Sequence, residues 1–138
     1  WHTSQPLDVE AMAAAARLLP GERDFGAFGS SPWDRRGEAP RHTIRRMTLA
    51  RCQWLAPDPL AETTQPDELA FDFAANGFLT GMARRLVGTL ALVGAGRLDA
   101  DGLRDILAAR DRRRAGPLAP PHGLCLTGVE YSPEMIHW

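Results

Sequence analysis

The sequence contains no lysine, only two cysteines and no long apolar segment. All 16 basic residues are therefore arginines, and 17 acidic residues bring the formal net charge to -1. This balance argues against a polybasic protein that binds nucleic acid without regard to sequence. No apolar run reaches the roughly 18 residues of a membrane-spanning helix, and the N-terminus lacks the pattern of a signal peptide. We therefore expect a cytoplasmic protein.

The cysteines and histidines form no recognisable ligand pattern. Cys52 and Cys125 make neither a CxxC motif nor a disulfide framework. Both lie in segments that we predict to be strands, so we expect two buried free thiols. The spacing of the four histidines relative to these cysteines matches no common zinc motif, and we predict no metal site.

The length of 138 residues fits one domain, and 44% hydrophobic residues are enough to fill a single core. The chain begins with Trp1 instead of methionine, which suggests a piece of a longer protein. The predicted order is helix, strand, strand, helix, helix, strand, with exposed connections at residues 30–41 and 56–67. The predicted strands are 43–54, 68–75 and 123–131, and the predicted helices are 6–19, 78–93 and one that Asp99 caps.

This order predicts an α+β fold, with a short antiparallel sheet covered on one face by helices. The apolar side of the first strand changes between Ile44 and Met47, which indicates a β-bulge. Leu69, Phe71 and Phe73 share one face of the second strand. Three strands are few for a free-standing sheet, so we expect one edge to need a strand that this chain lacks.

The helix predicted at 78–93 has two distinct faces. Gly77, Gly81, Arg84 and Gly88 share one of them. Because each helical glycine costs about 0.8–1 kcal/mol relative to alanine, we predict that another backbone, of protein or nucleic acid, approaches this face. Glycines tolerated in fraying turns beside a solvated arginine are the alternative. The opposite face is apolar and is predicted to pack on the sheet through Leu79, Met82, Ala83, Leu86, Leu90 and Val93.

Residues 76–88, NGFLTGMARRLVG, resemble the "FLxxMVRxxVG" helix of the tRNA pseudouridine synthase A family. The matching order continues through LVGAG at 92–96. In this helix Ala83 and Arg85 stand where the family has valine and, often, asparagine. Several ordered motifs at the right separations make the resemblance specific, and further ones lie on both sides of the helix.

Residues 119–126, APPHGLCL, resemble the family's "APxxGLxL" stretch, and Val129 and Tyr131 resemble its "VxY" ending. Upstream, residues 7–12 and the "DFxxF" loop at 24–28 match the family's first helix and the loop after it. The resemblance therefore spans nearly the whole chain. It implies the C-terminal half of a pseudouridine synthase fold, a ferredoxin-like subdomain without its first strand, over residues 1–138.

The resemblance also implies a function. Members of this family isomerise uridine to pseudouridine in the anticodon stem-loop of tRNA, act as homodimers and need no cofactor. Arg84 corresponds to the active-site arginine, which pairs with the catalytic aspartate and contacts substrate phosphate. A guanidinium can hold a carboxylate ionised through two parallel hydrogen bonds. Leu124 corresponds to the apolar residue beside the target base, where it excludes water.

The family's aspartate lies in a "GRTDxGVHA" stretch, and no segment of this sequence resembles it. We therefore expect the isolated chain to be inactive and to need an N-terminal half of the same enzyme as its partner. The candidates for contact with tRNA phosphates are Arg85, Arg45, Arg46, Arg112 and Arg113. Solvated arginines are the alternative for these positions. A non-catalytic RNA-binding module or a dimerisation domain is the alternative for the whole chain.

Overall fold

The computed structural model describes residues 1–31, 43–60 and 67–133, and most of the predicted connection at 30–41 and part of that at 56–67 lie outside these ranges. No helix in the described part is long and apolar enough to cross a membrane. The elements run α1 (Val9–Ala16), β1 (Gly21–Asp24), β2 (Ile44–Trp54), β3 (Leu69–Ala75), α2 (Met82–Gly94), α3 (Ala100–Ala109) and the short 3-10 helix η2 (Pro121–Gly123).

The three strands form one antiparallel sheet in the order β1-β2-β3. A register irregularity lies between Met47 and Leu49, just after the position where the sequence predicts a bulge. Two ion pairs join neighbouring strands: Arg46 with Glu22 of β1 at 3.3 Å, and Arg51 with Asp72 of β3 at 2.8 Å. Both ion pairs join residues that lie directly opposite each other, so they stabilise the observed strand register.

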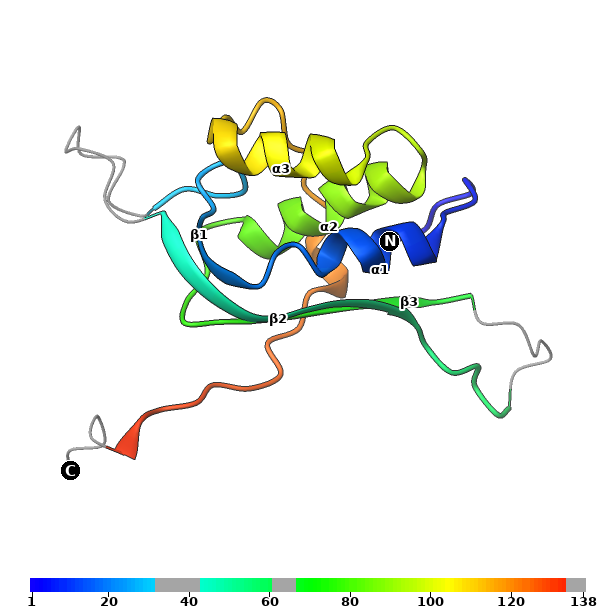
Figure 1. Cartoon of the computed structure of the whole chain (residues 1–138). Helices are drawn as coiled ribbons and strands as arrows, with labels where there is room; N and C mark the ends of the chain where they lie inside the picture. Colours follow the sequence, from blue (N-terminus) through cyan, green and yellow to red (C-terminus); the bar gives the residue numbers. More distant parts are fainter. Residues whose placement is uncertain (32–42, 61–66, 134–138) are drawn as a thin grey trace.

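All three helices lie on one face of the sheet, as Figure 1 shows, so the predicted α+β architecture is confirmed. Phe71 and Phe73 of β3 pack against the core from the sheet. Phe25 and Phe28, from the loop after β1, are fully buried with their ring centroids 6.2 Å apart. The other large, fully buried side chains are Met12, Leu19, Met47, Met82, Leu86, Leu90, Leu103 and Thr89.

Aspartates cap the first and last α-helices. The Asp8 carboxylate accepts a hydrogen bond of 2.9 Å from the Ala11 amide at the start of α1. The Asp99 carboxylate accepts one of 2.7 Å from the Gly102 amide at the start of α3, as predicted. Each cap satisfies a backbone donor that the first helical turn leaves unpaired.

Helix α2 begins at Met82, four residues later than predicted. Thr80 and Ser30 form an isolated antiparallel bridge, with the Thr80 amide donating to the Ser30 carbonyl at 3.0 Å. Gly81 then adopts a φ of 76°, which an α-helix does not allow. The predicted apolar face is confirmed, because five of its side chains are buried and Ala83 is half-buried: Leu79, Met82, Leu86, Leu90 and Val93.

Two predictions about strands are wrong. Strand β1 was not predicted, because its residues are mostly exposed and carry no apolar alternation. A strand was also predicted at residues 123–131, where the structure has η2 and an extended, exposed segment. That segment has strand-like spacing but pairs with no described strand edge, so no ladder forms. Cys125 is consequently exposed, whereas Cys52 is buried in β2 as predicted.

Candidate active-site wall

The glycine face of α2 is covered by the backbone of the segment after α3. A methyl group added to Gly88 would collide with the carbonyl oxygen of Pro117. One added to Gly116 would lie 2.6 Å from the carbonyl carbon of Gly88. The close approach predicted for this face is therefore confirmed at Gly88, and the approaching backbone is protein. Gly77 and Gly81 precede the helix.

A buried hydroxyl joins the same two segments. Thr89 is fully buried, and its Oγ1 donates a hydrogen bond of 2.7 Å to the Arg85 carbonyl. The same oxygen accepts one of 2.9 Å from the Gly116 amide. The role of Thr89 was not predicted, although a threonine between Gly88 and an apolar helix face is a signal of a buried hydrogen bond.

Arg84 and Arg85 hold the segment after α3 at two points, Ala119 and Gly116. Arg84 Nε donates to the Ala119 carbonyl at 2.6 Å, and the Ala119 amide donates to the Arg84 carbonyl at 3.1 Å. Arg85 Nη1 donates to the Gly116 carbonyl at 3.2 Å. Within the described ranges, no carboxylate forms an ion pair with Arg84. Its orientation is thus set by the chain itself, and its terminal nitrogens keep their hydrogen-bonding capacity.

Leu124 follows the clamped segment, which is Gly116–Ala119, after Pro120 and the short helix η2. The 3-10 turn of η2 ends with a hydrogen bond of 3.0 Å from the Leu124 amide to the Pro121 carbonyl. The Leu124 side chain is exposed. Arg84 and Leu124 are therefore connected through Ala119 and a single short turn, which links the two predicted site residues structurally.

The arginines predicted to contact RNA lie on three elements. Arg85 is on α2, Arg45 and Arg46 are on β2, and Arg112 and Arg113 are in the turn after α3. The structure pairs Arg46 with Glu22 and Arg113 with Asp111, at 3.3 and 2.9 Å. Hydrogen bonds from Arg113 lower the pKa of the Asp111 carboxyl. Arg112 is exposed, and Arg45 Nη1 donates to the Ile44 carbonyl at 2.8 Å.

One ion pair brings the turn after α3, which carries Arg112 and Arg113, to the end of the sheet where β2 begins. Arg110 Nε lies 3.3 Å from Asp24 Oδ2. Asp24 is the β1 residue opposite Ile44, next to Arg45 and Arg46. The turn after α3 is therefore close to the start of β2, whereas Arg85 is held against the segment after the turn.

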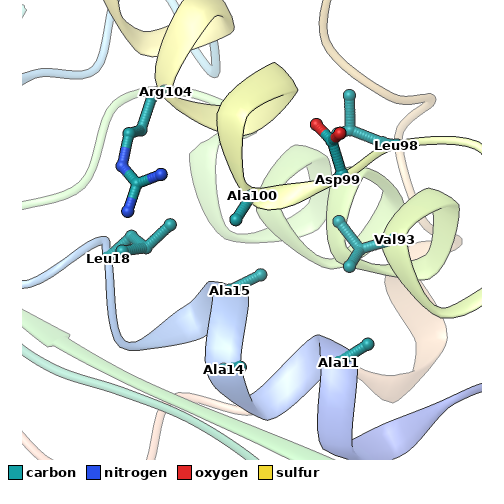
Figure 2. A pocket seen from close by; sticks show the side chains of 9 residues that line it. All are labelled: Ala11, Ala14, Ala15, Leu18, Val93, Leu98, Asp99, Ala100 and Arg104. Carbon is teal, nitrogen blue, oxygen red and sulfur yellow. The ribbon is translucent and has the colours of Figure 1, made fainter.

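A shallow cavity of about 470 Å³ lies between α1, the end of α2 and the start of α3 (Figure 2). Its polar groups already have partners, because Asp99 caps α3 and Arg104 pairs with Asp101 at 2.6 Å. None of the predicted site residues lines it. The lining residues are Ala11, Ala14, Ala15, Leu18, Val93, Leu98, Asp99, Ala100 and Arg104.

Comparison with known proteins supports the motif analysis. Residues 15–132 match the family described as tRNA pseudouridine synthase. "tRNA pseudouridine synthase A" of Chloroflexus aurantiacus is 44% identical over 99% of this chain and 45% of its own length. The proteins of that name from Methylobacterium sp. (strain 4-46) and Moorella thermoacetica are 42% and 43% identical, over 95% of this chain and 46% and 47% of their own lengths.

The chain thus spans about half the length of these curated relatives. The family match covers most of the chain, including α2, the clamped segment and Leu124. The chain belongs to the tRNA pseudouridine synthase family.

Proposed function

We propose that this chain is the C-terminal half of an enzyme that isomerises uridine to pseudouridine in the anticodon stem-loop of tRNA. Family membership supports the reaction, and the share of the relatives that the chain covers supports its assignment as one half. In this proposal, residues 1–138 form a domain that supplies one wall of the active site.

The observation that carries the proposal is the geometry of Arg84. Its Nε is occupied by the Ala119 carbonyl at 2.6 Å, which fixes the plane of the guanidinium. A guanidinium fixed in this way can hold a carboxylate or phosphate with its remaining donors at little entropic cost. Leu124, connected to Ala119 by η2, supplies an apolar surface for the target base.

The nucleophile in this proposal is an aspartate of the N-terminal half. It attacks the nucleoside, the glycosidic bond breaks, and the uracil rejoins the ribose through C5 while the C5 hydrogen leaves as a proton. Arg84 keeps the aspartate ionised and oriented for the attack. Because the carboxylate comes from outside, the isolated chain is inactive.

Contacts with tRNA are assigned to the end of the sheet where β2 begins. Arg112 is exposed in the turn after α3, and the Arg110–Asp24 pair brings that turn close to the start of β2, which carries Arg45 and Arg46. Arg113 and Arg46 would exchange their present carboxylate partners for phosphates, and Arg85 would contact the backbone near Arg84. We propose further that the complete enzyme is a homodimer that binds tRNA across both subunits.

The test compares the complete protein with this chain on tRNA whose uridines carry tritium at C5. Isomerisation releases the tritium to water, so the complete protein should release it and the chain of 138 residues should not. Release by the chain alone would contradict the assignment of the nucleophile. No release by the complete protein, despite salt-sensitive tRNA binding, would favour the non-catalytic RNA-binding module.

A further inference from the structure

Asp24, the last residue of β1, is a half-buried carboxylate that joins three segments of the chain. Its Oδ1 accepts hydrogen bonds of 2.9 Å from the Gly26 amide and 2.6 Å from the Thr43 hydroxyl. Its Oδ2 lies 3.3 Å from Nε of Arg110 at the end of α3. One side chain therefore connects the loop after β1, the residue before β2 and the C-terminal end of α3, which lie together in Figure 1.

The two oxygens of Asp24 have separate partners. Both hydrogen bonds go to Oδ1 and join parts of the connection between β1 and β2, whereas the ion pair goes to Oδ2 and reaches a distant helix. An asparagine at this position could keep an oxygen acceptor for Gly26 and Thr43 but would present an uncharged amide to Arg110. Substitution can therefore remove the ion pair and keep the local hydrogen bonds.

Arg110 adopts a backbone conformation that is unfavourable for an arginine. It ends α3 with a φ of 54°, and every other described residue with a positive φ is a glycine. Glycine is common at this position of a helix because it has no Cβ to clash with the backbone. A larger residue persists there only where the surrounding structure holds it. Here the guanidinium is held by the ion pair with Asp24.

The ion pair fixes one end of the turn after α3, residues 111–114, whose three arginines are exposed. Inside the turn, the Asp111 carboxylate accepts a hydrogen bond of 3.0 Å from the Arg113 amide. Beyond the turn, the Gly116 amide is bound to the Thr89 hydroxyl at 2.9 Å. The turn therefore has an internal hydrogen bond and an attachment on each side, and the ion pair provides the attachment on the side of the sheet.

The carboxylate of Asp24 lies between two groups of arginines. Arg45 and Arg46 follow Thr43 in β2, and the three arginines of the turn after α3 follow Arg110. A negative charge in such a place repels phosphate, so by its charge alone it would weaken the binding of RNA. A carboxylate that favours binding at this surface therefore acts through its geometry.

We propose that Asp24 is a positioning residue for tRNA. Through Arg110 it holds the turn after α3 beside the start of β2, so that one stretch of RNA backbone contacts the arginines of both segments. The inference rests on the proposed function, because it takes tRNA as the ligand. It adds an acidic residue to a surface whose contacts with phosphate are otherwise assigned to arginines alone.

The affinity of the complete protein for tRNA tests this role through Asp24→Asn. We expect the Kd to rise about 5-fold or more and to depend less steeply on salt, because the arginines of the turn no longer align with β2. The KM for tRNA should rise while kcat changes less than about 2-fold, because the turn contacts substrate away from the reacting atoms. An unchanged or lower Kd, which removal of a negative charge alone would give, would overturn the proposal. A fall in kcat without a rise in KM would also overturn it.

Arg110→Gly provides a second test in which no loss of folding is expected. Glycine suits a φ of 54°, so the Tm should be unchanged or higher, whereas the Kd for tRNA should again rise about 5-fold or more. Arg110→Lys keeps a cation for Asp24 and should recover most of the affinity. Arg104→Ala removes an exposed arginine from the same helix, so it is the control for loss of charge and should change the Kd less than about 2-fold. An Arg110→Gly protein that binds as tightly as Arg104→Ala would overturn the proposal.

The variants at Asp24 and Arg110 break the same contact, so the double variant should bind tRNA about as tightly as either single variant. Full additivity of the two effects on Kd would assign them to separate causes and overturn the proposal. No tRNA binding by the unsubstituted protein would overturn the proposed function and this inference with it. Normal binding by the unsubstituted protein and by all variants would overturn this inference alone.

Discussion

Arg84 Nε donates a hydrogen bond of 2.6 Å to the carbonyl oxygen of Ala119. The sequence places Arg84 on the side of α2 away from the core, which predicts a side chain with no structural role in its own domain. The structure changes this interpretation, because the guanidinium also holds the segment that leads to Leu124. Its role in the fold and its proposed role in the reaction therefore use different nitrogens.

For Arg84→Ala in the complete enzyme, we predict a loss of about 100-fold or more in kcat, because a positioned charge at the reacting groups is removed. We also predict a lower free energy of unfolding, by about 0.5–1.5 kcal/mol, because the Ala119 carbonyl loses its side-chain donor. Tritium release and urea denaturation measure the two effects separately.

Arg104→Ala is the control for this variant, since Arg104 is an exposed arginine on α3 that forms an ion pair with Asp101 and is none of the proposed site residues. It should keep its kcat and lose at most about 0.5 kcal/mol of stability. If Arg84→Ala retained the turnover of Arg104→Ala, the catalytic assignment of Arg84 would be wrong.

Thr89→Val should destabilise the chain by about 1–3 kcal/mol, because the Gly116 amide would be buried without an acceptor. Thr89→Ser keeps the hydroxyl and should recover most of this loss. Urea denaturation of the three proteins checks the order. Equal stability of the valine and serine variants would mean that the hydroxyl contributes nothing and that only packing matters.

Gly88→Ala should lower the free energy of unfolding by about 1–3 kcal/mol, because the new methyl group collides with the Pro117 backbone. This result opposes the usual gain from replacing a helical glycine, which is about 1 kcal/mol. Gly128→Ala, where nothing lies within 4 Å of an added methyl group, should be close to neutral. A stabilised Gly88→Ala protein would rule out the close contact.

The core-facing side of α2 was predictable from sequence because its apolar spacing and its burial in the core agree. The start of α2 was not predictable, because it depends on the bridge between Ser30 and Thr80, which are distant in the sequence. This bridge and the left-handed conformation of Gly81 keep the helix from beginning before Met82. Strand β1 was equally hidden, because a mostly exposed strand has no need of alternating apolar residues. Both errors come from pairing, which local patterns do not encode.

The predicted strand at residues 123–131 shows the reverse case. Its pattern has the spacing of a strand, but a strand forms only where another edge provides hydrogen bonds. The glycine face of α2 was interpreted correctly at Gly88, because the cost of a helical glycine indicates close contact whatever the contacting chain. The segment that contacts Gly88 and the hydrogen bonds of the Thr89 hydroxyl were not predictable, because they join residues that are distant in the sequence.

The two thiols should differ sharply in reactivity. Cys125 is exposed, whereas burial raises the pKa of the Cys52 thiol from 9.0 to about 11. At pH 8 a thiol reagent should therefore modify one cysteine in the folded chain and both in urea. Rapid modification of both without denaturant would contradict the burial of Cys52.

The Cys52 thiol also predicts a pH dependence of stability. Its folded pKa lies above the unfolded value, so the unfolded chain releases the proton more readily at high pH. The contribution of this group should be constant below pH 9 and be lost progressively between pH 9 and about 11. Cys52→Ala should lack this part of the decline, which urea denaturation across that range would measure.

The number of residues between Ala119 and Leu124, which includes the short turn of η2, determines how far Leu124 can lie from Arg84. Ala119 is tied to Arg84, so the residues between it and Leu124 act as a spacer between a fixed cation and an apolar surface. Insertion or deletion there would change the separation of charge and apolar contact without altering either side chain. In the proposed function, the space available to the target base would therefore depend on the length of this segment, which point substitutions leave unchanged.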